Sequence, residues 1–181
     1  MNKIIVILLN VIVLSACTFQ SSQYNFVKKL INIDGQDSNQ PNKNWVATWM
    51  NQKIDLYAIN FDNQIIYADE QINIFYKDKQ IYKVSGLFPD GTILDINRNK
   101  SNISYSSNNQ IISIDDCVEM VLIKTLNDTK EYSQKCALGD TDISYENKIF
   151  LNENNLVIGL SYKIHPNYPS LELSIKQDDD V

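Results

Sequence analysis

The chain has 181 residues, with 22 acidic and 16 basic side chains, a formal net charge of −6 and a pI of about 4.7. This balance argues against nucleic-acid binding, because phosphates are bound through basic patches. It also argues against adhesion to anionic headgroups by charge alone. The length fits a single domain that is large enough to bury a core.

The first 16 residues have the layout of a secretory signal peptide. A basic residue, Lys3, precedes an apolar stretch from Ile4 to Leu14, and the small residues Ser15 and Ala16 follow. The apolar stretch has about eleven residues, well short of the ~20 that a helix needs to cross a bilayer. A permanent transmembrane helix is therefore not expected.

The residues Leu14-Ser15-Ala16-Cys17 resemble the lipobox of bacterial lipoproteins. In that motif the thiol receives a diacylglycerol, and the amino group freed by cleavage is acylated. The resemblance implies lipidation at Cys17 and stable attachment to a membrane, because several acyl chains hold a protein where one does not. The alternative is an ordinary signal peptide that leaves Cys17 as a surface thiol. Thr18, in place of an Asp, favours the outer membrane of a Gram-negative bacterium over the inner one, and the domain is expected on its periplasmic face.

Residues 17–44 are predicted to connect the lipid to the folded domain. TFQSSQ, from Thr18 to Gln23, is short and polar and is typical of a tether. Tyr24 to Ile33 spaces its apolar residues as a short amphipathic helix does. Asp34 to Asn44 has the Gly, Pro and Asn content of a loop.

From Trp45 to the C-terminus the sequence is a series of short β-type runs, and residues 45–181 are predicted to form one β domain. Apolar and polar residues alternate from Gln71 to Tyr76 and from Gln80 to Val84. Pro89 to Gly91 predicts a turn. The remaining runs include WVATWM, IDLYAINF, QIIYA, NISYS, QIISID, EMVLIKTL, EYSQKCAL, ISYENKIFL, NLVIGLSYKI and SLELSIKQ. About a dozen such runs predict an all-β fold, an antiparallel meander that forms a barrel or a sandwich.

Two cysteines remain after Cys17, at positions 117 and 136. In an oxidising periplasm the simplest expectation is a Cys117–Cys136 disulfide, which closes a loop of about 20 residues and contributes ~3 kcal/mol. A metal pair and a redox pair are less attractive, because there is no CxxC motif and His165 is the only histidine. Two free or buried thiols are the remaining alternative.

Few residues of the chain are candidates for catalysis. His165 lies in IHPNYP, where a Pro-rich turn is the favoured interpretation over a Ser-His-Asp set. The adjacent carboxylates Asp69-Glu70 and Asp115-Asp116 point to opposite faces of a strand, so they are predicted to be solvated turn residues. No P-loop or GxGxxG motif occurs. We therefore expect no enzymatic activity, no metal and no cofactor.

The aromatic residues have two interpretations. Ten Tyr and two Trp in an exported β domain could form stacking platforms for sugars, because a tyrosine combines an apolar face with a hydroxyl group. The plainer interpretation is that Trp45, Trp49 and the tyrosines pack the core and the rims of the sheet.

Two stretches resemble the YjbF/GfcB family of exported lipoproteins. In the first, Tyr67-Ala68-Asp69-Glu70 corresponds to an aromatic-Ser-Asp-Gly turn, and Lys79 to Leu87 corresponds to an "nGRIVKTxGL" strand. Gln80 replaces the Arg of that motif, and Glu70 replaces the turn glycine. The resemblance implies that Gly86 bends the chain without a Cβ atom and that Ile81 and Leu87 are buried.

The second stretch runs from Cys136 to Gln177. Tyr145 to Phe150 is an offset version of the family's "F-x-N-x-[YF]" strand, Leu156 to Pro166 fits "GxVxxSxQxxxP", and Leu171 to Lys176 fits "LxLxxLKP" up to its final proline. The two stretches follow the family order behind the same kind of lipobox.

The resemblance implies a β-meander lipoprotein that is associated with capsular or extracellular polysaccharide production and export. Its partners would be polysaccharide export proteins or a glycan, and it offers no catalytic residues to carry over. Two alternatives stay open. One is a periplasmic carrier of lipids or lipoproteins with an apolar cavity inside the sheet. The other is a receptor or adhesin exposed on the cell surface.

Overall fold

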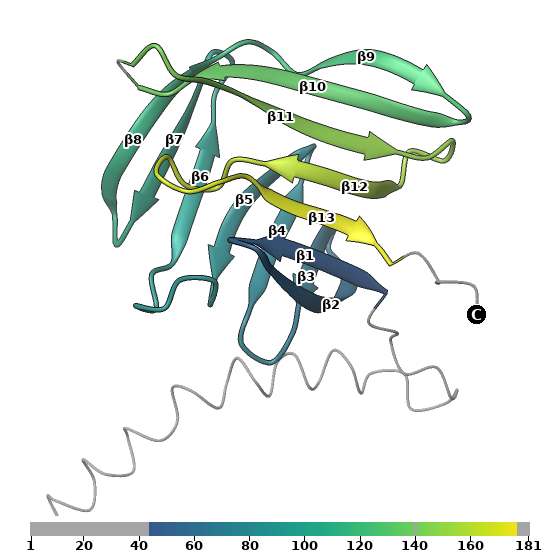
Figure 1. The fold of residues 1–181 in the computed structure, drawn as a ribbon, viewed down its shortest axis with the longest axis horizontal. Helices are drawn as coiled ribbons and strands as arrows, with labels where there is room; N and C mark the ends of the chain where they lie inside the picture. The colour runs from purple at the N-terminus through teal and green to yellow at the C-terminus, as the bar shows by residue number, and fades with distance from the viewer. Residues whose placement is uncertain (1–43, 140, 177–181) are drawn as a thin grey trace, which may run out of the picture. The chain divides into compact units, whose positions relative to one another are not determined.

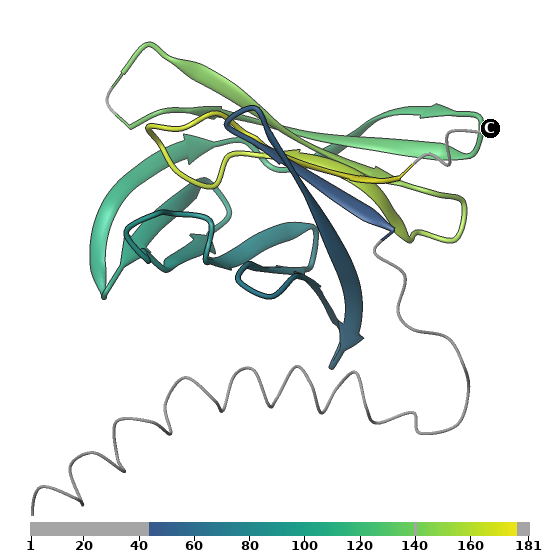
Figure 2. The same cartoon turned by 60° about the horizontal axis from the view of Figure 1, so that its bottom comes forward.

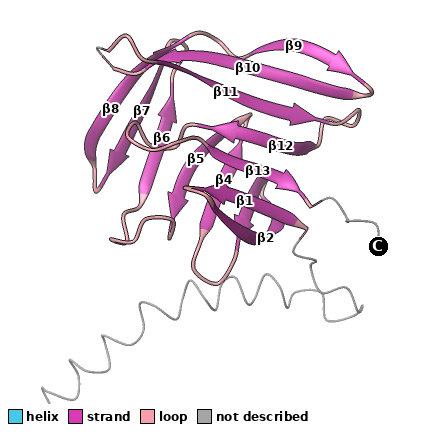
Figure 3. Ribbon diagram, viewed as in Figure 1, coloured by secondary structure: helices cyan, strands magenta, loops and turns pink. Residues whose placement is uncertain are grey.

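The computed structural model describes residues 44–139 and 141–176, and this part of the chain is built from strands (Figures 1 and 3). The strands are β1 (Trp45–Trp49), β2 (Gln52–Phe61), β3 (Gln64–Ala68), β4 (Asn73–Lys77), β5 (Gln80–Ser85), β6 (Leu94–Arg98), β7 (Asn102–Ser107), β8 (Gln110–Cys117), β9 (Val121–Leu126), β10 (Thr129–Ala137), β11 (Ser144–Leu151), β12 (Val157–Tyr162) and β13 (Leu171–Ile175). The predicted signal peptide, Cys17, the tether and the helix over residues 24–33 lie outside the described residues.

Twelve of the thirteen strands form a closed antiparallel barrel. Consecutive strands pair from β1 to β8 and from β10 to β13, and β8 pairs with β10. The ring closes between the first strand and the last, where Trp45 lies opposite Ile175 and Ala47 opposite Leu173. Of the two predicted architectures, the barrel is therefore the correct one.

Five hairpins use two-residue turns in which both central residues have positive φ. This conformation is the type I′ turn, whose twist matches that of the flanking strands. Asn and Asp tolerate positive φ better than other non-glycine residues, and they fill eight of the ten positions. The turns are Met50-Asn51, Asp62-Asn63, Asp78-Lys79, Asn108-Asn109 and Asn127-Asp128. The local sequence therefore favours an up-and-down meander.

Alternation along the strands fills the inside of the barrel. In β1 the residues Trp45, Ala47 and Trp49 are buried and the residues between them are partly exposed. Both tryptophans therefore belong to the core, as the plainer interpretation predicts. The fully buried side chains include Leu56, Tyr67, Ile74, Ile96, Tyr105 and Tyr162.

Because the strands alternate in direction, their connections gather at two ends of the barrel. One end is closed by an aromatic plug, which we define as Trp49, Phe88, His165 and Tyr168. Its ring centroids lie 4.8–5.9 Å apart in contacting pairs. Phe88 is on the β5–β6 connection, and its carbonyl accepts the N–H of Gly91 at 3.0 Å, which forms the predicted Pro-Asp-Gly turn.

Gly86 begins this connection and cannot be replaced without strain. Its φ is +81°, and a Cβ atom at this position would lie 2.0 Å from the carbonyl oxygen of Gln71. The backbone of the β3–β4 connection therefore passes directly over Gly86. Glycine is therefore needed at position 86 for two reasons. The chain bends there, and the Gln71 backbone lies too close for a Cβ atom.

β9 lies outside the closed ring and pairs with β10 alone, from Thr129 to Ser133 (Figure 2). Every residue of β9 is exposed, including Val121, Leu122, Ile123 and Leu126 at 50–55%. None of the described residues belongs to a helix that is long and apolar enough to span a membrane.

Candidate functional site

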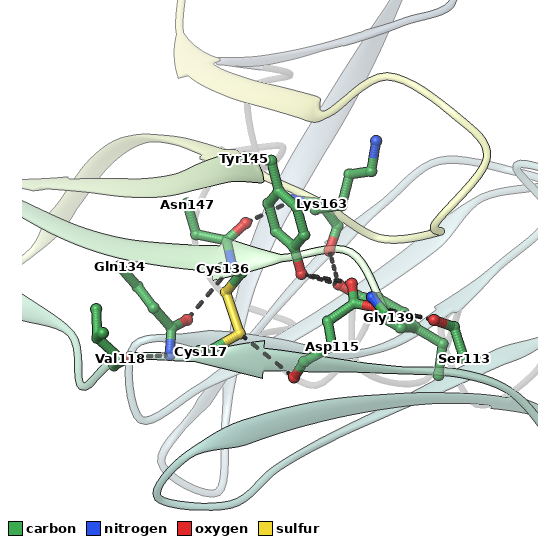
Figure 4. Close-up of a disulfide and its surroundings, with 11 residues drawn as sticks. Ser113, Asp115, Cys117, Val118, Gln134, Cys136, Gly139, Tyr145, Asn147 and Lys163 are labelled. Atoms are coloured by element: carbon green, nitrogen blue, oxygen red, sulfur yellow. Dashed lines mark hydrogen bonds between the residues drawn. A yellow bond between two sulfur atoms is a disulfide. The ribbon is translucent and has the colours of Figure 1, made fainter. Parts of the chain in front are cut away.

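A disulfide joins the two strands of a short seam of the barrel. β8 and β10 are paired at two positions, Cys117 with Cys136 and Asp116 with Ala137. The two cysteines for which a disulfide is expected face each other across this seam and are joined by one (Figure 4). Because the adjacent β10–β11 ladder contains eight residue pairs, the covalent bond supplies cohesion where the ladder is short.

Next to the seam, Asp115 is fully buried at 0% exposure. Its carboxylate accepts hydrogen bonds from Ser113 Oγ at 2.8 Å, from the Gly139 N–H at 3.2 Å and from the Tyr145 hydroxyl at 2.8 Å. The prediction that Asp115 is solvated is therefore wrong. Alternation turns Asp115 inward and its neighbour Asp116 outward, so the two carboxylates do point to opposite faces.

This carboxylate is one end of a buried polar network (Figure 4). The Tyr145 and Tyr105 hydroxyls are 2.8 Å apart, and Tyr105 donates to the Lys163 carbonyl at 3.2 Å. Burial raises the pKa of both tyrosines, so both hydroxyls stay protonated. Asn147 accepts from the Lys163 N–H at 2.8 Å. Every one of these groups has a partner, which identifies the network as a structural element.

His165 belongs to the aromatic plug. Its ring packs against Phe88 and Tyr168, and its Nδ1 atom accepts the Asn167 N–H at 3.1 Å. Burial lowers the pKa of His165, and the positive charge of Lys163 lowers it further. The ammonium of Lys163 donates to the Tyr168 carbonyl at 2.5 Å. His165 therefore helps to close one barrel end, in the Pro-rich connection where the sequence places it.

The opposite end of the barrel is hollow. A cavity of about 900 Å³ opens there, which is within the usual range for ligand sites. Its rim comes from the β2–β3, β4–β5 and β11–β12 connections, rich in Asn and charged residues. Its walls include Trp45, Tyr76 and Tyr132. The cavity therefore combines a polar rim with aromatic walls.

Beneath this cavity, polar atoms are buried without hydrogen-bond partners among the described residues. They include the hydroxyls of Tyr67 and Tyr162, both on side chains that are 0% exposed, and Nη1 of Arg98. Trp45, in the cavity wall, packs on Tyr67 with ring centroids 4.7 Å apart. Buried polar groups are almost always paired, so this layer is unusual for a filled barrel.

Arg98 connects this buried layer to the cavity. Its Nη2 atom donates to the carbonyl of Asp78, a cavity residue, at 3.3 Å. Burial raises the pKa of the Tyr76 and Tyr162 hydroxyls, and the positive charge of Arg98 opposes the rise at both. The guanidinium therefore lies close to both tyrosines. Sequence reasoning missed Arg98, although the alternation Leu94, Ile96, Arg98 already points its side chain inward.

Residues 44–139 and 141–176 contain no group of three or more His, Cys, Asp or Glu side chains arranged to hold a metal ion. Cys17, the predicted lipidation site, is outside these residues. The features that remain as a candidate site are the cavity, its lysines and the buried layer around Arg98.

The fold and the cavity define a class, the small closed antiparallel barrel with one plugged and one open end. No protein-family model matches the chain, and no curated protein matches it. Among solved structures, the chain is similar to the crystal structure of the hypothetical lipoprotein YmcC from Escherichia coli K12. The TM-score is 0.53 at 9% identity, over 76% of this chain and 84% of that chain. At this identity the likeness is one of fold.

Proposed function

We propose that the protein is a lipid-anchored envelope protein, held at the periplasmic face of the outer membrane, that acts as a non-enzymatic accessory in capsular or extracellular polysaccharide production or secretion. The observation that carries the proposal is the combination of a Leu-Ser-Ala-Cys lipobox with a barrel whose fold is shared by a protein described as a lipoprotein. The polysaccharide role rests on the resemblance of Lys79 to Leu87 and of residues 136–177 to the YjbF/GfcB family.

The non-enzymatic role is supported by where the reactive side chains lie. His165 packs between aromatic rings, and Asp115 has its oxygens occupied by Ser113, Gly139 and Tyr145. General acid–base catalysis needs a titratable group within reach of a substrate. Neither group faces the cavity at the open end.

The cavity also bears on the carrier alternative. An acyl-chain carrier needs a deep apolar interior, whereas this barrel is filled by side chains such as Leu56, Ile74 and Ile96. The hollow part is confined to one end and about half of its lining is polar. These features favour a hydrophilic ligand over an acyl chain.

The test is genetic complementation in the native host. Deletion of the gene should lower the amount of surface polysaccharide, and the intact gene should restore it. Cys17→Ser should leave the protein unlipidated and restore the polysaccharide poorly, while Cys117→Ser should leave the lipid attached. Unchanged polysaccharide in the deletion strain, in amount and in localisation, would contradict the proposal.

A second experiment identifies binding partners and distinguishes the accessory role from the carrier and receptor alternatives. The lipidated protein is crosslinked in cell envelopes and recovered for mass spectrometry of proteins and small molecules. Recovery of export proteins or glycan supports the accessory role. Recovery of phospholipid with no export protein supports the carrier instead, and protease accessibility on intact cells would support a surface receptor.

A further inference from the structure

Arg98 carries a positive charge below the cavity. A guanidinium stays charged at any physiological pH, and none of the ion pairs formed among residues 44–139 and 141–176 includes Arg98. The residue is partly buried and its Nη1 atom is buried, beside the neutral phenols of Tyr76 and Tyr162, while the charge of Asp78 also acts on Tyr76. A partly buried charge is screened less than an exposed one, so an anion in the cavity would be favourable.

Two lysines add to this charge at the cavity wall. Lys77 and Lys79 both line the cavity and are partly buried, and neither joins an ion pair within the described part of the chain. The ammonium of Lys79 lies 3.7 Å above the ring centroid of Tyr132, which positions it from a second strand. The cation–π contact fixes the ammonium without neutralising it.

Two acidic side chains also line the cavity. Asp62 and Asp78 belong to exposed turn positions, whereas Lys77 and Lys79 are partly buried. Exposed charges are screened by water and salt, whereas partly buried charges are screened much less. The two exposed carboxylates therefore offset the two lysines only in part, and Arg98 adds a further positive charge. This balance favours an anion at the cavity of a chain whose overall charge is −6.

The remaining polar lining matches a ligand with many hydroxyl groups. Asn60 and Asn63 present amides that can both donate and accept hydrogen bonds. Gln64 and Asn152 add amide NH2 donors, because their oxygens already accept from the Tyr82 hydroxyl and from the N–H groups of Asn154 and Leu156. Tyr76 and Tyr132 add aromatic faces, which pack against the apolar faces of sugar rings. Phosphate or another small anion would use the cations but leave most of these amides without a role.

We infer that the cavity at the open end of the barrel binds an acidic saccharide, whose carboxylate lies in the field of Arg98, Lys77 and Lys79 and whose hydroxyls contact the amide-lined rim. This inference rests on the proposed function and names the ligand class for it. Arg98 acts from beneath the floor through Tyr76, while Lys79 is placed to contact the ligand directly.

The test uses the intact protein in nanodiscs of phosphatidylcholine, with binding measured by isothermal titration calorimetry. The probes are trigalacturonate, maltotriose and inorganic phosphate. Trigalacturonate should bind at least about tenfold more tightly than maltotriose, the ratio expected from one charge-assisted hydrogen bond. Salt at 0.5 M should weaken the binding of trigalacturonate and leave that of maltotriose unchanged.

Variants locate the site. Arg98→Gln and Lys79→Gln should each weaken trigalacturonate binding, by about tenfold for Arg98. Arg98→Lys, which keeps the charge, should retain part of the affinity. Lys53→Gln is the matched control, because Lys53 is an exposed lysine of β2 outside the cavity. It removes one positive charge and should leave binding unchanged. Thermal melts of each variant check folding, and Lys79→Gln at the rim keeps the test valid if Arg98→Gln is unstable.

Three outcomes would overturn the inference. They are equal binding of trigalacturonate and maltotriose, phosphate binding as tight as trigalacturonate, and equal effects of Lys53→Gln and Lys79→Gln. Failure here is distinct from failure of the proposed function. If the deletion strain loses polysaccharide while no saccharide binds, the accessory role stands without this cavity. If saccharide binds while the deletion strain is unaffected, the cavity stands and the polysaccharide role is lost.

Discussion

The two ends of this barrel are built from the same kind of hairpin and have opposite interiors. At one end Trp49, Phe88 and Tyr168 pack ring against ring. At the other end the strands enclose a cavity of about 900 Å³ above buried hydroxyls that have no partner among the described residues. Aromatic side chains pack closely at the plugged end, whereas the open end has looser packing and more polar groups. Sites of binding commonly show such a loss.

The largest effect is expected at the plugged end, from Gly86→Ala. The added Cβ atom meets the Gln71 carbonyl at 2.0 Å on a backbone with φ of +81°. Steric overlap and the left-handed backbone together should lower the free energy of unfolding by about 4 kcal/mol. The matched control is Gly91→Ala, with φ of +75° and open space around the Cβ position. It should cost about 1 kcal/mol in urea denaturation. Equal costs would mean that the two connections do not touch.

The next effect concerns the seam between β8 and β10. Cys117→Ala with Cys136→Ala removes the bond that links the two-pair ladder. The loss should be about 3 kcal/mol for a loop of this size. Hydrogen exchange should accelerate at the amides of Val118 and Ala137 and stay slow in the plug. Uniform acceleration over the whole barrel would instead show that the seam is not a separate weak point.

A smaller effect of opposite sign is expected for the unpartnered hydroxyls. Tyr162→Phe removes a buried hydroxyl that lacks a hydrogen bond, so it should stabilise the protein by about 1 kcal/mol. Tyr145→Phe is the paired control, because its hydroxyl donates to Asp115 at 2.8 Å. It should destabilise the protein by about 1–2 kcal/mol. Chemical denaturation gives both values, and destabilisation of equal size by the two changes would refute the difference between the ends.

The smallest effect is a pH dependence of the plug. Burial, aided by the charge of Lys163, lowers the pKa of His165 in the folded state below its ordinary value of 6.5. The unfolded chain therefore binds the proton more readily, and stability should fall as pH drops below about 6.5. His165→Gln should flatten this part of the curve of unfolding free energy against pH. The variant also alters the hydrogen bond from the Asn167 N–H. The comparison therefore uses the slopes of unfolding free energy against pH for the two proteins, and equal slopes would contradict the expectation.

Sequence reasoning was most successful where the cause is local. The β-type run QIIYA predicted β3 from Gln64 to Ala68, and alternation from Gln80 to Val84 predicted β5, which spans Gln80–Ser85. Gly86, singled out by the family resemblance, lies where a Cβ atom cannot fit. These features depend on neighbours along the chain, which a single sequence displays.

The failures concern features fixed by tertiary contacts. Asp115 was predicted to be a solvated turn residue, but three donors from β8, β11 and the β10–β11 connection compensate its burial. Arg98 was not singled out, since its inward direction matters only once β6 is part of a closed ring. The choice between barrel and sandwich depended on pairing between residues about 130 positions apart, which leaves no periodic trace in the sequence.

The pairing of β1 with β13 also has a consequence for biogenesis. Trp45 is among the first residues of the domain and Ile175 among the last, and they are direct partners. Contacts between distant positions form slowly, because the intervening chain must be ordered first. If the protein is exported as proposed, its domain cannot complete the ring until β13 has crossed the membrane. Until then both terminal strands present free edges, the surfaces from which chains aggregate. We therefore expect the emerging chain to depend on periplasmic chaperones until its last strand arrives.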